Sequence, residues 1–138
     1  MPTNEPLDPQ RTPRSVAFSR KVFTFAGIYG VLVMAPNYFM EGWIGRHAAP
    51  PITHPEYFYG FIGLALAWQL IFLLIGRDPL RYRAAMIPAV LEKAAFGVPA
   101  LVLYACGRLA ALTLVPALID LCLGVLFVLA FRATARPE

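Results

Sequence analysis

The sequence contains few charged residues. Only 14% of its 138 residues are charged, whereas 59% are hydrophobic. A soluble domain carries about 25% charged residues, so the deficit indicates a membrane protein whose apolar surface is covered by lipid. No basic face interleaved with aromatic residues is evident, and we therefore expect no nucleic-acid partner.

Cysteine and histidine are also scarce. Cys106 and Cys122 form no CxxC pair and are expected at different membrane depths, which argues against a disulfide and against thiol-oxidase chemistry. His47 and His54 lie in a proline-rich loop at a spacing that matches no compact ligand motif. Because both histidines fall outside the expected helices, a bis-histidine haem is excluded. We expect no metal and no cofactor.

Four long hydrophobic runs make up most of the chain. They cover residues 18–40, 57–76, 84–104 and 109–131. Each is about 20 residues or longer, enough for a helix to cross roughly 30 Å of hydrocarbon. The first run lacks a clear small-x-small cleavage site, so we interpret it as an uncleaved helix rather than a signal peptide. The predicted fold class is all-α membrane, with residues 18–132 forming one antiparallel four-helix transmembrane bundle.

Polar segments flank and connect these runs. Residues 1–17 are rich in proline and predict a disordered cytoplasmic tail, and residues 133–138 predict a second cytoplasmic tail. The longest connection, residues 41–56, is flanked by aromatic residues of the kind that favour the membrane–water interface. A short interfacial helix around Asn37–Gly45 is compatible with this pattern.

The basic residues predict the orientation of the helices. Nine of them lie before or at the start of the first run, between the second and third, or after the fourth: Arg11, Arg14, Arg20, Lys21, Arg77, Arg81, Arg83, Arg132 and Arg136. Only Arg46 and Arg108 lie in the other two connections. The positive-inside rule then places both termini in the cytoplasm. We expect a multi-pass protein of a bacterial-type inner membrane, in contact with the lipid bilayer.

Ionisable residues inside the hydrophobic runs mark a candidate site. Glu92 and Lys93 lie within the third run and Asp120 within the fourth. Such groups cost a few kcal/mol or more at the bilayer centre, so they usually face a protein interior and pair with one another. At about 1.5 Å per residue, Gln69 in the second run and Tyr29 in the first fall at a similar depth. We predict that these five residues form one polar layer.

Residue spacing predicts how this layer is paired. Small residues spaced along the third and fourth runs put Lys93 and Asp120 on faces that can approach closely, so we expect these two to pair. Glu92 lies about 100° around the helix from Lys93 and is expected to face the first or second helix, with Gln69 as a candidate partner. One interpretation is a buried ion pair that fixes helix packing. The other is a ligand-binding or proton-handling site in which Glu92 is the surplus carboxyl.

Two stretches resemble segments of uncharacterised small bacterial membrane proteins. They are HPEYFYG at residues 54–60 and LEKAAFG at residues 91–97. Together with the size of the chain, its four spans and its cytoplasmic termini, these stretches make the chain resemble small bacterial membrane proteins of DoxX-like architecture. The compact bundle with membrane carboxylates also resembles the emopamil-binding, sterol-isomerase-like fold. That resemblance implies that Glu92 and Asp120 hold a cationic amine or a sterol intermediate.

Three functions are compatible with the sequence. The leading one is a small integral membrane protein, not an enzyme, that binds an apolar or amphipathic small molecule or acts as a subunit beside a membrane-protein partner or a second copy. The second is a small membrane enzyme acting on a lipid or quinone, with Glu92 as acid or base. The third is a proton-coupled carrier that works as an oligomer.

Overall fold

The computed structural model describes residues 13–48 and 51–135, and within these ranges every regular element is helical. The long helices are α1 (Pro13–Met34), α3 (Pro55–Arg77), α4 (Met86–Ala105) and α5 (Ala111–Ala133). Three short elements connect them: the 3₁₀ helix η1 (Ala35–Phe39), α2 (Glu41–His47) and the 3₁₀ helix η2 (Arg83–Ala85).

Four stretches of the described chain are long and apolar enough to cross a membrane. They are Arg14–Phe39, Pro55–Arg77, Arg83–Ala105 and Ala111–Ala133. Their length and composition are compatible with a small integral membrane protein. The prediction of an all-helical chain with four candidate spans is therefore confirmed.

The ends of the helices differ from those expected in two places. α1 begins at Pro13, whose missing N–H is tolerated in the first turn of a helix, so residues 13–17 are helical rather than part of a tail. α1 ends at Met34 rather than near residue 40, because Pro36 cannot donate a backbone hydrogen bond to continue it. Residues 1–12 and 136–138 of the predicted tails lie outside the described part of the chain.

Local hydrogen bonds explain the turn that follows α1. The Asn37 side-chain amide donates to the Val33 carbonyl at 2.6 Å and so satisfies one of the carbonyls left free at the helix end. The chain continues through η1 into α2, which provides the short helix expected near residues 37–45. Tyr59 in α3 then donates to a Glu41 carboxylate oxygen at 2.6 Å and ties α2 to the start of α3.

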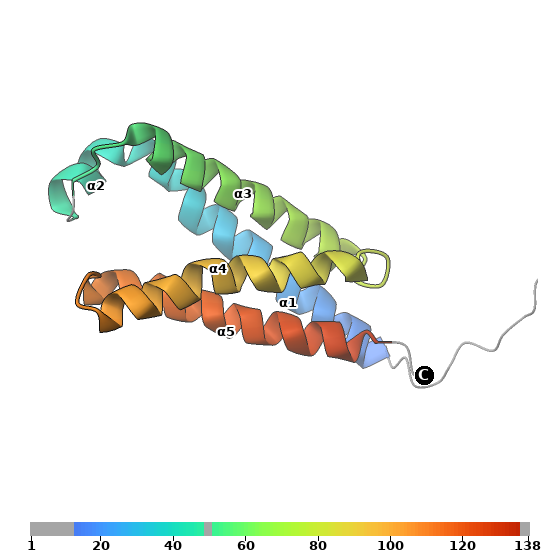
Figure 1. Cartoon of the computed structure of the whole chain (residues 1–138). Helices are drawn as coiled ribbons and strands as arrows, with labels where there is room; N and C mark the ends of the chain where they lie inside the picture. The colour runs from blue at the N-terminus through green and yellow to red at the C-terminus, as the bar shows by residue number, and fades with distance from the viewer. Residues whose placement is uncertain (1–12, 49–50, 136–138) are drawn as a thin grey trace, which may run out of the picture.

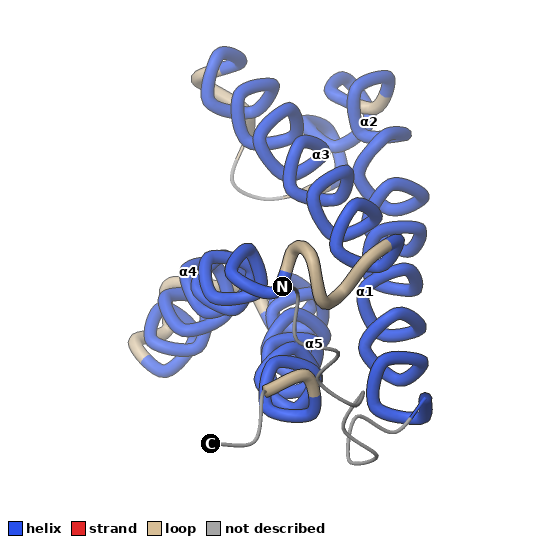
Figure 2. The backbone as a smooth tube through the Cα atoms, turned by 90° about the vertical axis from the view of Figure 1, so that its right-hand side faces the viewer, coloured by secondary structure: helices blue, strands red, loops and turns tan. Residues whose placement is uncertain are grey.

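The long helices form two closely packed pairs. α1 packs along α3, α4 packs along α5, and α1 also packs against α5. α3 and α4, by contrast, touch only over a short stretch. Figure 1 shows that α3 and α4 approach each other near the loop that joins them and diverge toward the end that carries α2. Figure 2 shows the same two pairs from the end of that loop.

Three phenylalanines form the centre of the core. Phe23 of α1, Phe72 of α3 and Phe127 of α5 are fully buried. The Phe23 and Phe127 rings stack with centroids 4.2 Å apart, and the Phe72 ring meets Phe127 edge-on at 5.0 Å. Met86, at the start of α4, joins the same cluster. This core therefore holds the four helices together in the half of the bundle where α3 and α4 converge.

Polar contacts reinforce the same half of the bundle. The Ser19 hydroxyl of α1 donates to the Ala130 carbonyl of α5 at 3.1 Å. The Arg83 guanidinium donates to the Phe131 carbonyl at 3.2 Å and lies 3.8 Å from the centroid of the Phe131 ring. These contacts join α5 to α1 and to η2, so the bundle is fastened at the converging end.

Candidate functional site

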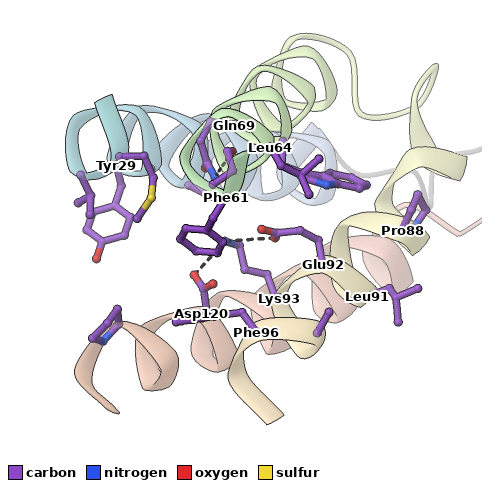
Figure 3. Close-up of a pocket in the computed structure, with 18 residues that line it drawn as sticks. Tyr29, Phe61, Leu64, Gln69, Pro88, Leu91, Glu92, Lys93, Phe96 and Asp120 are labelled. Atoms are coloured by element: carbon purple, nitrogen blue, oxygen red, sulfur yellow. Dashed lines mark hydrogen bonds and ion pairs between the residues drawn. The ribbon is translucent and has the colours of Figure 1, made fainter. Parts of the chain in front are cut away.

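Lys93 lies between two carboxylates near the middle of α4. Its residue surface is only 4% exposed. Its ammonium donates to Asp120 Oδ1 of α5 at 2.8 Å and lies 3.3 Å from Glu92 Oε2. The structure therefore contains the Lys93–Asp120 pair that the residue spacing predicts, and Glu92 joins it (Figure 3).

The packing around Lys93 leaves room for its long side chain. A Cβ placed on Gly124 of α5 would lie only 3.3 Å from the Lys93 Cβ, so glycine on the facing helix lets α4 and α5 approach closely at Lys93. The ammonium also lies 5.1 Å from the centroid of the Phe72 ring of α3, within the range of a cation–π interaction. Lys93 thus connects α4 with both α5 and α3.

Of the two carboxylates, Glu92 interacts more weakly with the Lys93 ammonium than Asp120 does. Its side chain is 16% exposed, yet its Oε2 atom is buried and makes no hydrogen bond with any described group. The 3.3 Å contact with the Lys93 ammonium is an ion pair without hydrogen-bond geometry. Because one ammonium faces two carboxylates, Glu92 carries the surplus acceptor of the cluster.

Gln69 of α3 contributes a second acceptor without a donor. It is 3% exposed, and its Nε2 donates to the Ala65 carbonyl one turn earlier at 3.0 Å. Its Oε1 has no hydrogen-bond partner in the described structure and lies against Gly30 of α1, where any larger residue would occupy the same space. Gln69 is therefore not hydrogen-bonded to Glu92, in contrast to the expected partnership, because its amide donor turns back to its own helix.

All five residues of the predicted polar layer line one cavity. Its volume is about 550 Å³, and its walls come from α1, α3, α4 and α5. Figure 3 shows Gln69 on one wall and Glu92, Lys93 and Asp120 on the opposite wall, with Tyr29 to one side. Apart from these residues, the lining is almost entirely apolar. The cavity lies where α3 and α4 diverge, so its shape follows from the helix packing described above.

Three further aromatic residues of the cavity, besides Tyr29, were not among the predicted site residues. Trp68 and Phe61 of α3 line it together with Phe96 of α4. The Phe61 and Phe96 ring centroids are 6.0 Å apart and make a contact between the two diverging helices. The sequence signal for the two aromatic residues of α3 is that they share a helical face with Gln69, since positions 61, 65, 68 and 69 follow the i, i+4, i+7 and i+8 spacing.

Metal ligands are not grouped in the described residues. No set of three or more His, Cys, Asp or Glu side chains there could hold a metal ion. The His54 ring lies 3.2 Å from Glu56 at the exposed start of α3, and the His47 ring contacts the Trp43 carbonyl at 2.8 Å. The chemistry of the site is therefore carried by the polar layer of the cavity.

Comparison with models of protein families, with curated proteins and with solved structures gives no match for this chain. The resemblances of residues 54–60 and 91–97 to DoxX-like proteins, and of the bundle to the sterol-isomerase-like fold, stay predictions.

The ion pair predicts an unequal effect of removing its two partners. Lys93→Met leaves two largely buried carboxylates without a cation and should lower the free energy of unfolding by about 3–5 kcal/mol. Asp120→Asn should cost less, because Glu92 remains beside the ammonium. Unfolding by SDS in mixed micelles measures both, with Arg108→Met, at an exposed position, as the control.

The double variant Lys93→Met/Asp120→Asn tests whether Lys93 and Asp120 are energetically coupled or contribute independently to stability. It should be more stable than the sum of the single effects implies, because it removes both charges of the pair. Strictly additive losses would contradict an energetic coupling between Lys93 and Asp120.

Proposed function

We propose that the chain is a small integral membrane protein that binds an apolar or amphipathic small molecule in the cavity between α3 and α4. The observation that carries this proposal is a cavity of about 550 Å³ with apolar walls and one polar layer. Small-molecule sites typically have volumes of about 300–1,000 Å³ and combine apolar linings with a few polar groups that orient the ligand. Glu92, Lys93, Asp120, Gln69 and Tyr29 are the polar groups available for this.

The placement of the ligand follows from the proposed orientation in the membrane. Both termini lie on the cytoplasmic side of a bacterial-type inner membrane, and successive helices run antiparallel. Basic residues support this, since Arg14, Arg20 and Lys21 lie in the first part of α1 and Arg132 in the last turn of α5. Arg11 and Arg136, which add to the same side, lie outside the described residues. Lys93 and Asp120 then lie within the hydrocarbon region, and an apolar ligand reaches the cavity from the lipid.

The enzyme and carrier alternatives would use the same cavity. Both need Glu92 to exchange a proton, and its Oε2 atom has no hydrogen-bond donor in the described structure. The same free acceptor is equally compatible with a binding protein, because a hydrogen-bond donor of a bound ligand can pair with this oxygen without any reaction. Ligand binding requires only what the cavity contains, and for that reason we favour it.

Cysteine accessibility tests the orientation. Cys106, at the end of α4, is exposed and should react with a membrane-impermeant maleimide from the periplasmic side when Cys122 is replaced by Ser. Leu80→Cys, placed in the α3–α4 connection of a chain otherwise free of cysteine, should react only in inverted vesicles. Labelling of both positions from the same side would contradict a membrane-crossing α4, and the reverse pattern would contradict cytoplasmic termini.

Native mass spectrometry of the protein in mild detergent tests ligand binding. The wild type should carry a reproducible additional small-molecule mass, and Glu92→Gln should fold normally but lose most of it. Ala95→Phe, which fills the cavity from α4, should also lose the mass although Glu92 is intact. Glu56→Gln, at an exposed carboxyl outside the cavity, is the matched control and should keep it. A bare protein in every sample would contradict the proposed function.

A further inference from the structure

We propose that the converging end of the bundle binds the phosphate of an anionic phospholipid, with Arg83 as the residue that holds it. This site is separate from the cavity and does not depend on the proposed function. Three features support it: basic residues without carboxylate partners, a guanidinium held in place against an aromatic ring, and exposed apolar side chains about one turn deeper in the bundle.

Basic residues gather at this end of the bundle. Within the described chain they come from the first part of α1, the end of α3, the α3–α4 connection and the last turn of α5: Arg14, Arg20, Lys21, Arg77, Arg81, Arg83 and Arg132. Figure 1 shows these segments at the same end. The Ser19 hydroxyl of α1 donates to the Ala130 carbonyl of α5, and the Arg83 guanidinium donates to the next carbonyl along α5. The basic residues of α1 and α5 that adjoin these contacts therefore lie at a level similar to that of Arg83.

These basic residues lack carboxylate partners. Ion pairs within the described chain involve only Lys93, in the cavity, and the exposed His54. Asp78 is the one acidic residue at this end among the described residues, and its Oδ1 accepts from the Arg81 backbone N–H at 3.1 Å, which closes the turn after α3. The positive charge of this end is therefore not neutralised within the described chain, and it attracts a negatively charged partner.

Arg83 is the basic residue best prepared to bind a phosphate. Its guanidinium lies 3.8 Å from the centroid of the Phe131 ring and donates to the Phe131 carbonyl at 3.2 Å. Its Nε atom, by contrast, is buried and has no acceptor among the described residues. A guanidinium already held in one orientation loses less conformational freedom on binding, and its planar set of donors matches the oxygens of a phosphate. The side chain as a whole remains partly exposed, so a phosphate has access to this group.

The position of the site favours a lipid over a soluble phosphate. One candidate span begins at Arg83 and another ends at Ala133, so the basic residues lie where hydrophobic segments meet the layer of lipid head groups. Ile87 follows Arg83 by about one turn and is 60% exposed, and Leu129 precedes Arg132 by about one turn and is 47% exposed. Acyl chains therefore have apolar surface beside the phosphate site, which a free phosphate ion would not use.

Native mass spectrometry in mild detergent resolves the binding of single lipids and tests this site. The protein is titrated with dioleoylphosphatidylglycerol, which is anionic, or with dioleoylphosphatidylcholine, which has the same acyl chains but a zwitterionic head group. The wild type should bind its first phosphatidylglycerol at a concentration about tenfold lower than its first phosphatidylcholine. Glycerol 3-phosphate, added in millimolar excess, should not displace the bound phosphatidylglycerol.

Variants separate a built site from a diffuse positive charge. Arg83→Gln should reduce the preference for phosphatidylglycerol to within about threefold. Arg83→Lys keeps the charge but loses the planar donors, so it should also weaken binding several-fold. Arg132→Gln, at an exposed position, leaves the Arg83 contacts intact and should weaken binding several-fold in a protein that folds normally. Arg108→Gln removes the same charge at the opposite end and is the matched control, and Ala95→Phe fills the cavity; both should keep the preference.

Each contrary result overturns the proposal without deciding whether the cavity binds a ligand. Equal affinity of the wild type for the two lipids would overturn it, as would a preference that persists in both Arg83→Gln and Arg132→Gln. Wild-type affinity in Arg83→Lys would show that any positive charge suffices and that Arg83 forms no specific phosphate site. Displacement by glycerol 3-phosphate would indicate a site for a soluble phosphate, and a preference lost in Ala95→Phe would place the lipid in the cavity.

Discussion

The ammonium of Lys93 and the two carboxylates around it impose the main constraint on this bundle. An isolated charge in a region covered by lipid is costly, so Lys93 has to lie where Asp120 and Glu92 can reach it. The ion pair joins α4 to α5, and Lys93 lies on the face of α4 that is buried in the bundle. The cluster also contains one carboxylate more than the ammonium can neutralise, so the polar layer of the cavity has an acidic group in excess.

The shape of the bundle follows from where the large side chains are. The stacked phenylalanines and the Ser19 and Arg83 contacts fasten the helices at one end. Toward the other end α3 and α4 touch little, although the Phe61–Phe96 contact joins them beside the cavity. Close packing and an open cavity therefore coexist because they occupy different halves of the same four helices, and the polar layer lies at the boundary between them.

The sequence predicted the helical class and the four candidate spans, because apolar length is a local property. It also predicted the Lys93–Asp120 pair, because a buried charge needs a partner and small residues on both runs let the two helices approach. The end of α1 at Met34 was missed because the first run was defined by its hydrophobicity, which continues past Pro36 although the helix does not. The environment of Gln69 was also missed, since residue depth says nothing about whether its amide turns toward Glu92 or back to Ala65. The cavity depends on the angle between α3 and α4, which is set by packing across the whole bundle and is not visible in any one segment.

A crystal structure grown from a lipidic mesophase would test the central claim most directly. We expect Lys93 between Asp120 and Glu92, with a bound molecule in the space between α3 and α4 whose donor lies within hydrogen-bond distance of Glu92 Oε2. Contact between α3 and α4 along their whole length, with their side chains filling that space, would contradict a ligand-binding cavity between these helices.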